Sequence, residues 1–252
     1  MNEPVKIHTN PKIVSSATHD SVCVSESSSY EFARHVNAAP LTTAEFAIAS
    51  REFPIVFSRV DESYTPVALL GLRDQENLFL AEDGSWTGRY VPASLRWYPF
   101  VLSQDEKAKT YTLCLDEASD RVNQTGEGEP LFVDDGEASP YLKRMGDFAK
   151  VFQRNSDASR VFSGELDSLG LLKSGQLRFK LPDGKTGATR GFFTVDQDRL
   201  KALDAEVVRE LLVRDKLLLI NAHLLSLNCL SDLARKAGMT AMGEGGQQVA
   251  TS

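Results

Sequence analysis

The chain has 252 residues, of which 42% are hydrophobic and 25% are charged, as is usual for a soluble globular protein with a buried core. Its net charge of −7 weighs against nonspecific DNA or RNA binding and against docking on anionic lipid, since both need a basic face. The three cysteines, Cys23, Cys114 and Cys229, lie far apart without metal-ligand spacing, which predicts free thiols in a reducing compartment.

The N-terminal residues are rich in Ser, Thr, Asn and His and show no hydrophobic period, so we predict a flexible tail over 1–38. They lack the basic-then-apolar pattern of a signal peptide, from which we expect a cytoplasmic protein. A second flexible tail is predicted over 239–252, where glycines are frequent. Between the tails, we expect a single domain over 39–238.

The first half of this domain has the pattern of an antiparallel meander. A helix is predicted over 44–51, where Thr42 or Thr43 provides an N-cap hydroxyl. Short apolar runs rich in β-branched residues predict strands at 54–57, 67–72, 78–80, 100–102 and 111–115. A long acidic loop follows over 116–140, and we expect its Asp and Glu residues to be solvated rather than to bind a metal.

The second half changes to a helical period. Apolar residues at helical spacing predict a long helix from Tyr141 to about Phe162. A hairpin is then expected around 182–185, flanked by strands at 177–181 and 191–195, and helices follow over 196–203, 205–213 and 215–237. Within the last of these, 217–231 contains no Asp, Glu, Lys or Arg. It is shorter than the roughly 20 apolar residues of a membrane span, so we predict a central buried helix.

Strands come first and helices later, without regular βαβ alternation. This order predicts an α+β fold in which a mainly antiparallel sheet from the N-terminal half packs with helices from the C-terminal half.

Several strings, in their order and spacing, resemble the bacterial SapC family, which is named for a surface-layer protein locus. They cover roughly residues 40–238 and read Phe53-Pro54-Ile55-Val56-Phe57, Pro66-Val67-Ala68-Leu69-Leu70-Gly71-Leu72, Asn77-Leu78-Phe79, Arg89-Tyr90-Val91-Pro92, Tyr98-Pro99-Phe100, Gly128-Glu129-Pro130-Leu131-Phe132, Gly191-Phe192-Phe193-Thr194-Val195-Asp196 and Ala222-His223-Leu224-Leu225-Ser226-Leu227. The resemblance implies a link to surface-layer or envelope transport. It also implies genetic neighbours of the TonB-dependent receptor and flavin-dependent halogenase types, and it carries over no catalytic residues.

No familiar catalytic or nucleotide-binding motif is present: GxGxxG, GxxxxGK[ST], HExxH and GxSxG are all missing. His223 is the one histidine outside the predicted tails, so we expect no multi-histidine metal site. A histidine on an apolar helix is usually a packed core residue, and the alternative is a residue that lines a pocket and exchanges protons. We include His223 among the candidate binding residues and expect no cofactor.

The strongest candidate for a recognition surface is a segment rich in aromatic and basic residues. Such side chains are enriched at interface hot spots because they bury area and still make directional contacts. The alternative is that the aromatics belong to the core while the arginines pair with the acidic loop. The candidate residues are Trp86, Arg89, Tyr90, Arg96 and Trp97, with Tyr98 beside them.

These observations predict a SapC-like accessory or binding protein without defined catalysis. We expect a protein or peptide partner, no nucleic acid and no membrane insertion. The alternative is an enzyme or enzyme partner that acts on a peptide or small molecule alongside a flavin-dependent halogenase-like protein, with His223 in a deep pocket. A third possibility is a structural subunit of an oligomer.

Overall fold

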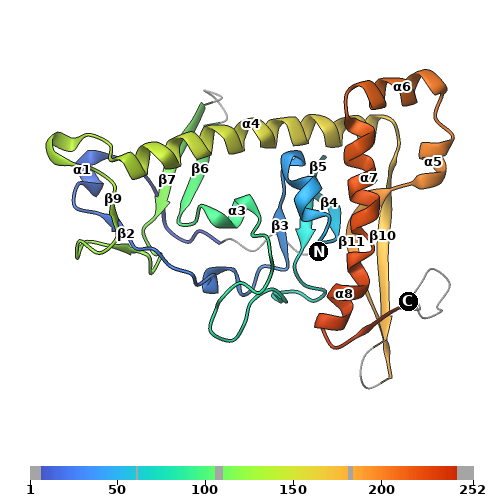
Figure 1. Ribbon diagram of the computed structural model, residues 1–252, viewed down its shortest axis with the longest axis horizontal. Helices are drawn as coiled ribbons and strands as arrows, with labels where there is room; N and C mark the ends of the chain where they lie inside the picture. The colour runs from blue at the N-terminus through green and yellow to red at the C-terminus, as the bar shows by residue number, and fades with distance from the viewer. Residues whose placement is uncertain (1–6, 61, 106–109, 181–183, 243–252) are drawn as a thin grey trace.

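The computed structural model describes residues 7–60, 62–105, 110–180 and 184–242. Figure 1 shows an elongated molecule in which α4 (Pro140–Ser168) runs along most of its length. Ser139 caps this helix by accepting a hydrogen bond from the Leu142 amide, and Pro140 occupies its first turn, where a missing amide costs nothing.

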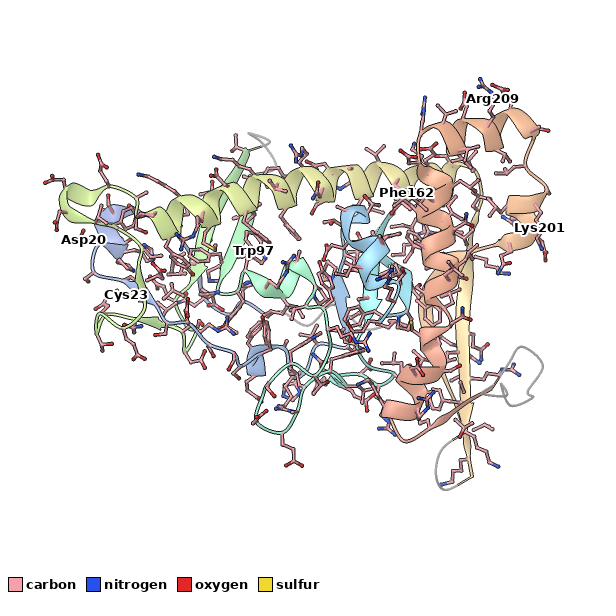
Figure 2. The ribbon with its side chains drawn as sticks, viewed as in Figure 1. Asp20, Cys23, Trp97, Phe162, Lys201 and Arg209 are labelled. Carbon is pink, nitrogen blue, oxygen red and sulfur yellow. The ribbon has the colours of Figure 1, made fainter. Side chains whose placement is uncertain are left out.

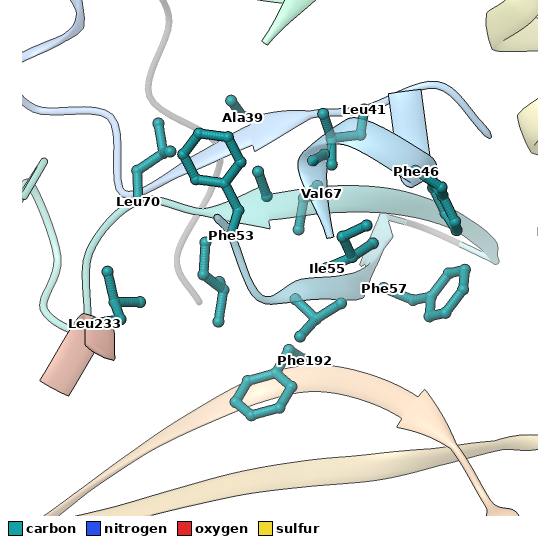
Figure 3. Close-up of a cluster of buried hydrophobic side chains, with 14 of the residues drawn as sticks. Ala39, Leu41, Phe46, Phe53, Ile55, Phe57, Val67, Leu70, Phe192 and Leu233 are labelled. Carbon is teal, nitrogen blue, oxygen red and sulfur yellow. The ribbon is translucent and has the colours of Figure 1, made fainter. Parts of the chain in front are cut away.

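In the described part of the chain, the largest sheet has six strands in the order β12-β10-β11-β4-β5-β3, and every neighbouring pair is antiparallel. These strands are β3 (Ala38–Pro40), β4 (Ile55–Val60), β5 (Ser63–Leu69), β10 (Leu172–Lys180), β11 (Thr186–Val195) and β12 (Thr240–Met242). The strand β4 begins with Ile55, Val56 and Phe57, which are all fully buried. Figure 3 shows Ile55 and Phe57 within the main core, between Phe46 and Phe192.

The hairpin of β10 and β11 extends beyond the rest of the sheet, and two aromatic rings stabilise it. Phe192 lies directly opposite Gly175, and Phe179 lies directly opposite Gly187. A Cβ atom at either glycine would collide with the facing ring, so the glycines let the rings lie flat against the backbone. Both rings are buried as a result.

Two three-stranded sheets occupy the other end of the described molecule, in the orders β1-β7-β6 and β8-β2-β9. Their strands are β1 (Pro11–Ile13), β2 (Cys23–Val24), β6 (Phe100–Asp105), β7 (Thr110–Asp116), β8 (Val122–Asn123) and β9 (Glu129–Pro130). The short helical segments that precede α4 in the chain are α1 (Ser16–His19), η1 (Glu31–Ala33), η2 (Thr43–Glu45), α2 (Phe46–Ala49), α3 (Ala93–Arg96) and η3 (Asp134–Gly136).

The prediction of a flexible tail over 1–38 is wrong for residues 7–38, which form β1, α1, β2, η1 and the start of β3. Val22, Val24 and Val36 are buried, so the segment contributes to the core despite its polar composition. Its backbone is also held by a distant carboxylate, because Asp116 accepts hydrogen bonds from the Thr9 and Asn10 amides at 3.0 and 2.8 Å.

The long helix α4 joins two hydrophobic cores. Phe162 and Leu166 pack in the main core beside the six-stranded sheet, whereas Leu142 and Ala149 pack in a second core with Trp97. Figure 2 shows Trp97 and Phe162 under different parts of the helix.

We expect Gly164→Ala to raise the free energy of unfolding by about 0.5–1 kcal/mol, because Gly164 lies inside α4 and alanine restricts the unfolded chain. A Cβ atom there would meet nothing within 4 Å. Urea unfolding measures the change. Gly175→Ala is the matched contrast: the Phe192 ring occupies the space of the new methyl group, so the same substitution should destabilise the protein.

The C-terminal helices are α5 (Gln197–Lys201), α6 (Ala205–Val213), α7 (Lys216–Ser226) and α8 (Cys229–Lys236). The predicted buried helix over 217–231 is divided between α7 and α8, and only one face of α7 is buried. Ile220 and His223 are fully covered, whereas Leu218 and Leu225 are 67% and 66% exposed. Among the described residues, Lys216–Lys236 is long and apolar enough to cross a membrane by length and composition alone, as are many core helices of soluble proteins.

The predicted α+β class is confirmed, with an antiparallel sheet from the N-terminal half packed against C-terminal helices. The hairpin of β10 and β11 adds C-terminal strands to that sheet. The run 78–80 forms no strand and contributes only an isolated bridge from Leu80 to Trp86. In the tail predicted over 239–252, Met239 and Ala241 are buried and β12 pairs with β10, while 243–252 lie outside the described residues.

Candidate functional site

The segment from Trp86 to Trp97 does not form one continuous surface. Trp86 packs inward, with its ring stacked on Phe79 at a centroid distance of 5.7 Å, and its Nε1 donates a hydrogen bond to the Tyr90 carbonyl at 2.8 Å. Trp97 is only 6% exposed and belongs to the second core. The arginines of the segment are exposed, so the segment combines core aromatics with surface cations.

Glu52 fixes the backbone at Arg89. Its carboxylate accepts hydrogen bonds from the Arg89 amide at 2.8 and 3.0 Å and from the Tyr90 amide at 3.0 Å. The loop approaches closely because Gly88 has no side chain: a Cβ atom there would lie 2.7 Å from Glu52 Oε1 and 2.6 Å from Trp86 Nε1. The Arg89 side chain therefore extends from a rigid turn.

Tyr90 is held from the other side by Glu45, a carboxylate that is only 6% exposed. The Tyr90 hydroxyl donates to Glu45 Oε1 at 2.8 Å, and burial together with this carboxylate raises the pKa of Tyr90 well above its usual value. Tyr90 also contacts Arg96, whose guanidinium lies 5.4 Å from the centre of the ring. Tyr90 thus follows one arginine of the segment in the chain and contacts the other.

Arg89 and Tyr90 line a cavity of about 760 Å³ that we call the cationic cavity. Three segments meet there: the end of α2 and the residues after it, the loop of Arg89, and α8. The lining residues are Ile48, Arg51, Glu52, Phe79, Arg89, Tyr90, Asp232, Arg235 and Lys236.

The charges around this cavity are unbalanced. Asp232 pairs with Arg235 at 2.6 Å, and Glu52 directs its oxygens to backbone amides. In the described part of the chain, no carboxylate pairs with the side chains of Arg51, Arg89 or Lys236; Lys236 lies 4.9 Å from the centre of the Phe79 ring. In a protein with a net charge of −7, this cavity therefore carries a local excess of positive charge.

Arg96 and Trp97 face a different cavity of about 630 Å³, which we call the aromatic cavity. Residues of the N-terminal segment, the turn at Tyr98 and the start of α4 surround it. Its lining residues are Val24, Ser25, Glu26, Ser27, Ser28, Tyr30, Arg96, Trp97, Tyr98, Arg121, Glu129, Tyr141 and Met145. Arg96 and Tyr90 lie at the boundary between the two cavities, and Arg96 Nη2 donates to Tyr90 Oη at 3.4 Å.

His223 lines neither cavity. It is fully buried where β4 and β11 diverge, since those strands pair only at Phe57 and Phe193. The Val195 amide donates to Nε2 at 3.0 Å, so Nδ1 carries the proton and donates to the Ile55 carbonyl at 2.8 Å. Burial lowers the pKa of His223 to about 4. Both ring nitrogens are occupied, and the structure therefore gives this candidate binding residue a role in packing.

Cys229 begins α8, the helix that lines the cationic cavity. Burial and the neighbouring Asp232 and Glu52 raise the pKa of Cys229, which keeps it a thiol at neutral pH and a poor nucleophile. The described residues contain no group of three or more His, Cys, Asp or Glu side chains that would hold a metal ion.

Sequence patterns identified Arg89 and Tyr90 but missed Arg51, Arg235 and Lys236. Arg51 follows a short helix with no distinctive motif. Asp232, Arg235 and Lys236 share one face of α8 at helical spacing, a pattern typical of any solvated helix. Only the fold brings these cations to the loop of Arg89.

A protein-family model described as SapC matches residues 14–233, most of the chain. No curated protein and no solved structure matches the chain.

Proposed function

The chain belongs to the SapC family, and from this premise we propose that it is an accessory protein that binds an acidic segment of a protein partner in the cationic cavity. The observation that carries the proposal is the set of cations in that cavity without carboxylate partners among the described residues, Arg51, Arg89 and Lys236. The family name supports a link to surface-layer or envelope transport, and we place this activity in the cytoplasm as part of the same proposal.

The cavity suits carboxylates for geometric reasons. The guanidinium groups of Arg51 and Arg89 each offer paired N–H donors, which match the two oxygens of an Asp or Glu side chain. Ile48, which is 50% exposed, adds an apolar contact beside them. Because Glu52 and Gly88 fix the turn at Arg89, little order has to be gained on binding.

The alternative of an enzyme depends on His223 in a pocket with convergent polar groups. The sealed position of His223 and the raised pKa of Cys229 favour the binding protein over this alternative. The third possibility, a structural subunit of an oligomer, is suggested by the exposed apolar side chains on α6 and α7, namely Leu212, Leu218 and Leu225. Light scattering tests it.

We expect a fluorescent peptide rich in Asp and Glu to bind the full chain, and a matched peptide with Asn and Gln in their place to bind much more weakly. The Arg51→Gln/Arg89→Gln double variant should lose roughly a hundredfold or more in affinity, because it removes two charged hydrogen-bonded contacts of about 1.5–3 kcal/mol each. Fluorescence anisotropy measures both, and added salt should weaken the binding.

Arg209→Gln is the matched control, since Arg209 is an exposed arginine on α6 that lines neither cavity. Equal binding of the two peptides, or unchanged affinity in the double variant, would rule out the cationic cavity as the partner site. The double variant should retain the wild-type unfolding free energy to within about 0.5 kcal/mol, because both side chains are exposed.

A further inference from the structure

A buried arginine without a carboxylate partner forms part of the aromatic cavity. Arg121 is 9% exposed, and its guanidinium donates hydrogen bonds to the carbonyls of Tyr98 (3.2 Å) and Ser29. In the part of the chain that the structure describes, no Asp or Glu forms an ion pair with it. Two hydrogen bonds leave part of its five-donor capacity unused, and the group lines the cavity.

Aromatic rings surround this guanidinium, and they offset only part of the free-energy cost of burying its charge. It lies 5.2 Å from the centre of the Phe32 ring and 5.6 Å from the centres of the Tyr30 and Tyr98 rings. Cation–π contacts stabilise a desolvated charge, but they do not use its N–H donors. An anion in the cavity would supply an acceptor for the remaining N–H donors and a counter-charge for the buried guanidinium.

The residues that line the cavity indicate what kind of ligand body would fit beside the anionic group. Trp97 and Tyr98 are buried aromatic residues that line the cavity, and Tyr141 lines it from α4. Burial, with Glu129 nearby, raises the pKa of Tyr141 to about 12, so its hydroxyl remains a donor at neutral pH. Flat apolar walls favour a flat apolar ligand body.

The charges that line the cavity favour a ligand with a single negative charge. Arg96 adds one cation, whereas Glu26 and Glu129 add two acids, and Glu129 is shared with Arg144 at 3.5 Å. A phosphate or dicarboxylate would place excess negative charge near these acids. We propose that the aromatic cavity binds a small organic monocarboxylate with a flat apolar or aromatic body, its carboxylate directed to Arg121. This site is separate from the proposed partner site.

The test uses three probes that share one body, namely 3-phenylpropionate, its neutral amide and 2-phenylethylammonium. We expect the carboxylate to bind the full chain roughly tenfold more tightly than the amide, as one charged hydrogen-bonded contact would give, and the ammonium to bind least. Two-dimensional NMR follows the indole N–H signals. Trp97 lines the cavity and should shift, while Trp86 lines neither cavity and should not.

Arg121 also holds the N-terminal segment in place, so its substitution risks unfolding the protein. Arg96→Gln changes an exposed cation of the same cavity and should weaken carboxylate binding several-fold, while Arg209→Gln should leave it unchanged. The Arg51→Gln/Arg89→Gln variant should bind 3-phenylpropionate normally, which separates this site from the partner site. Equal binding of carboxylate and amide, absence of carboxylate binding, or a Trp97 signal that carboxylate binding leaves unchanged would overturn the proposal.

Discussion

Acidification from pH 7 to pH 4 should remove about 3 kcal/mol of stability through His223 alone. The unfolded histidine titrates near its ordinary pKa of 6.5, whereas burial lowers the pKa of folded His223 to about 4. The group contributes its full stability above pH 6.5, where both states are neutral. Below 6.5 the unfolded state takes up a proton that the folded state excludes, so stability falls until about pH 4 and then levels off. One pKa unit corresponds to about 1.4 kcal/mol, which gives the total.

Urea unfolding at a series of pH values measures this slope, and His223→Asn should remove it. The asparagine amide can still donate to the Ile55 carbonyl but leaves the Val195 amide unpaired, so we also expect a loss of about 1–3 kcal/mol at pH 7. Burial also lowers the pKa of His8, and the difference between wild type and variant isolates His223.

His35→Asn is the matched control, because it makes the same substitution at an exposed histidine. Should His223→Asn fail to fold, NMR titration of the wild-type imidazole gives the pKa directly. A value near 6.5, or a slope that persists in a folded His223→Asn variant, would contradict a sealed neutral histidine.

Patterns of neighbouring residues in the sequence predicted those helices and strands whose burial follows a regular period. The buried run at Ile55 to Phe57 forms β4, and the apolar period after Tyr141 forms α4, because each pattern matches one burial geometry. The strands β10 and β11 flank the hairpin turn predicted at 182–185, of which residues 182 and 183 lie outside the described residues. The length of these two strands could not be predicted, since the contacts of Gly175 and Gly187 with the facing rings depend on strand register.

The N-terminal segment could not be predicted because distant residues order it. Its amides bind Asp116, and Tyr30 and Phe32 stack on Arg121, about 90 residues away in the chain. No periodicity within residues 7–38 records these contacts. A polar composition therefore predicted a tail where the structure has a stabilised segment.

The candidate site was predicted only in part for the same reason. Arg89 and Tyr90 are adjacent in the sequence and stand out by composition. Arg51 and Lys236 become part of the same cavity through the packing of α8 against the region of α2, which no local pattern specifies. His223 was correctly placed on an apolar helix, but its two backbone partners on β4 and β11 required the fold.

Glu45→Ala should lower the free energy of unfolding by about 3 kcal/mol or more, because it leaves several buried donors without an acceptor. Glu45 Oε2 accepts from the Thr42 amide at 2.8 Å and the Thr42 hydroxyl at 2.9 Å. Its Oε1 accepts from the Tyr90 hydroxyl and the Ala93 amide, each at 2.8 Å. This one carboxylate thus connects the start of η2 to the segment that carries both exposed arginines.

Glu45→Gln should cost less, about 1–2 kcal/mol, since its amide oxygen still accepts while its amide nitrogen faces donors. Glu206→Gln is the exposed control and should change stability by no more than about 0.5 kcal/mol. Tyr90→Phe combined with Glu45→Gln in a double-mutant cycle isolates their shared bond, and a coupling near zero would contradict it. Tyr90 lines the cationic cavity next to Arg89 in the chain, so loosening it should weaken acidic-peptide binding even in variants that remain folded. We therefore expect Glu45 to act as a positioning residue for this cavity.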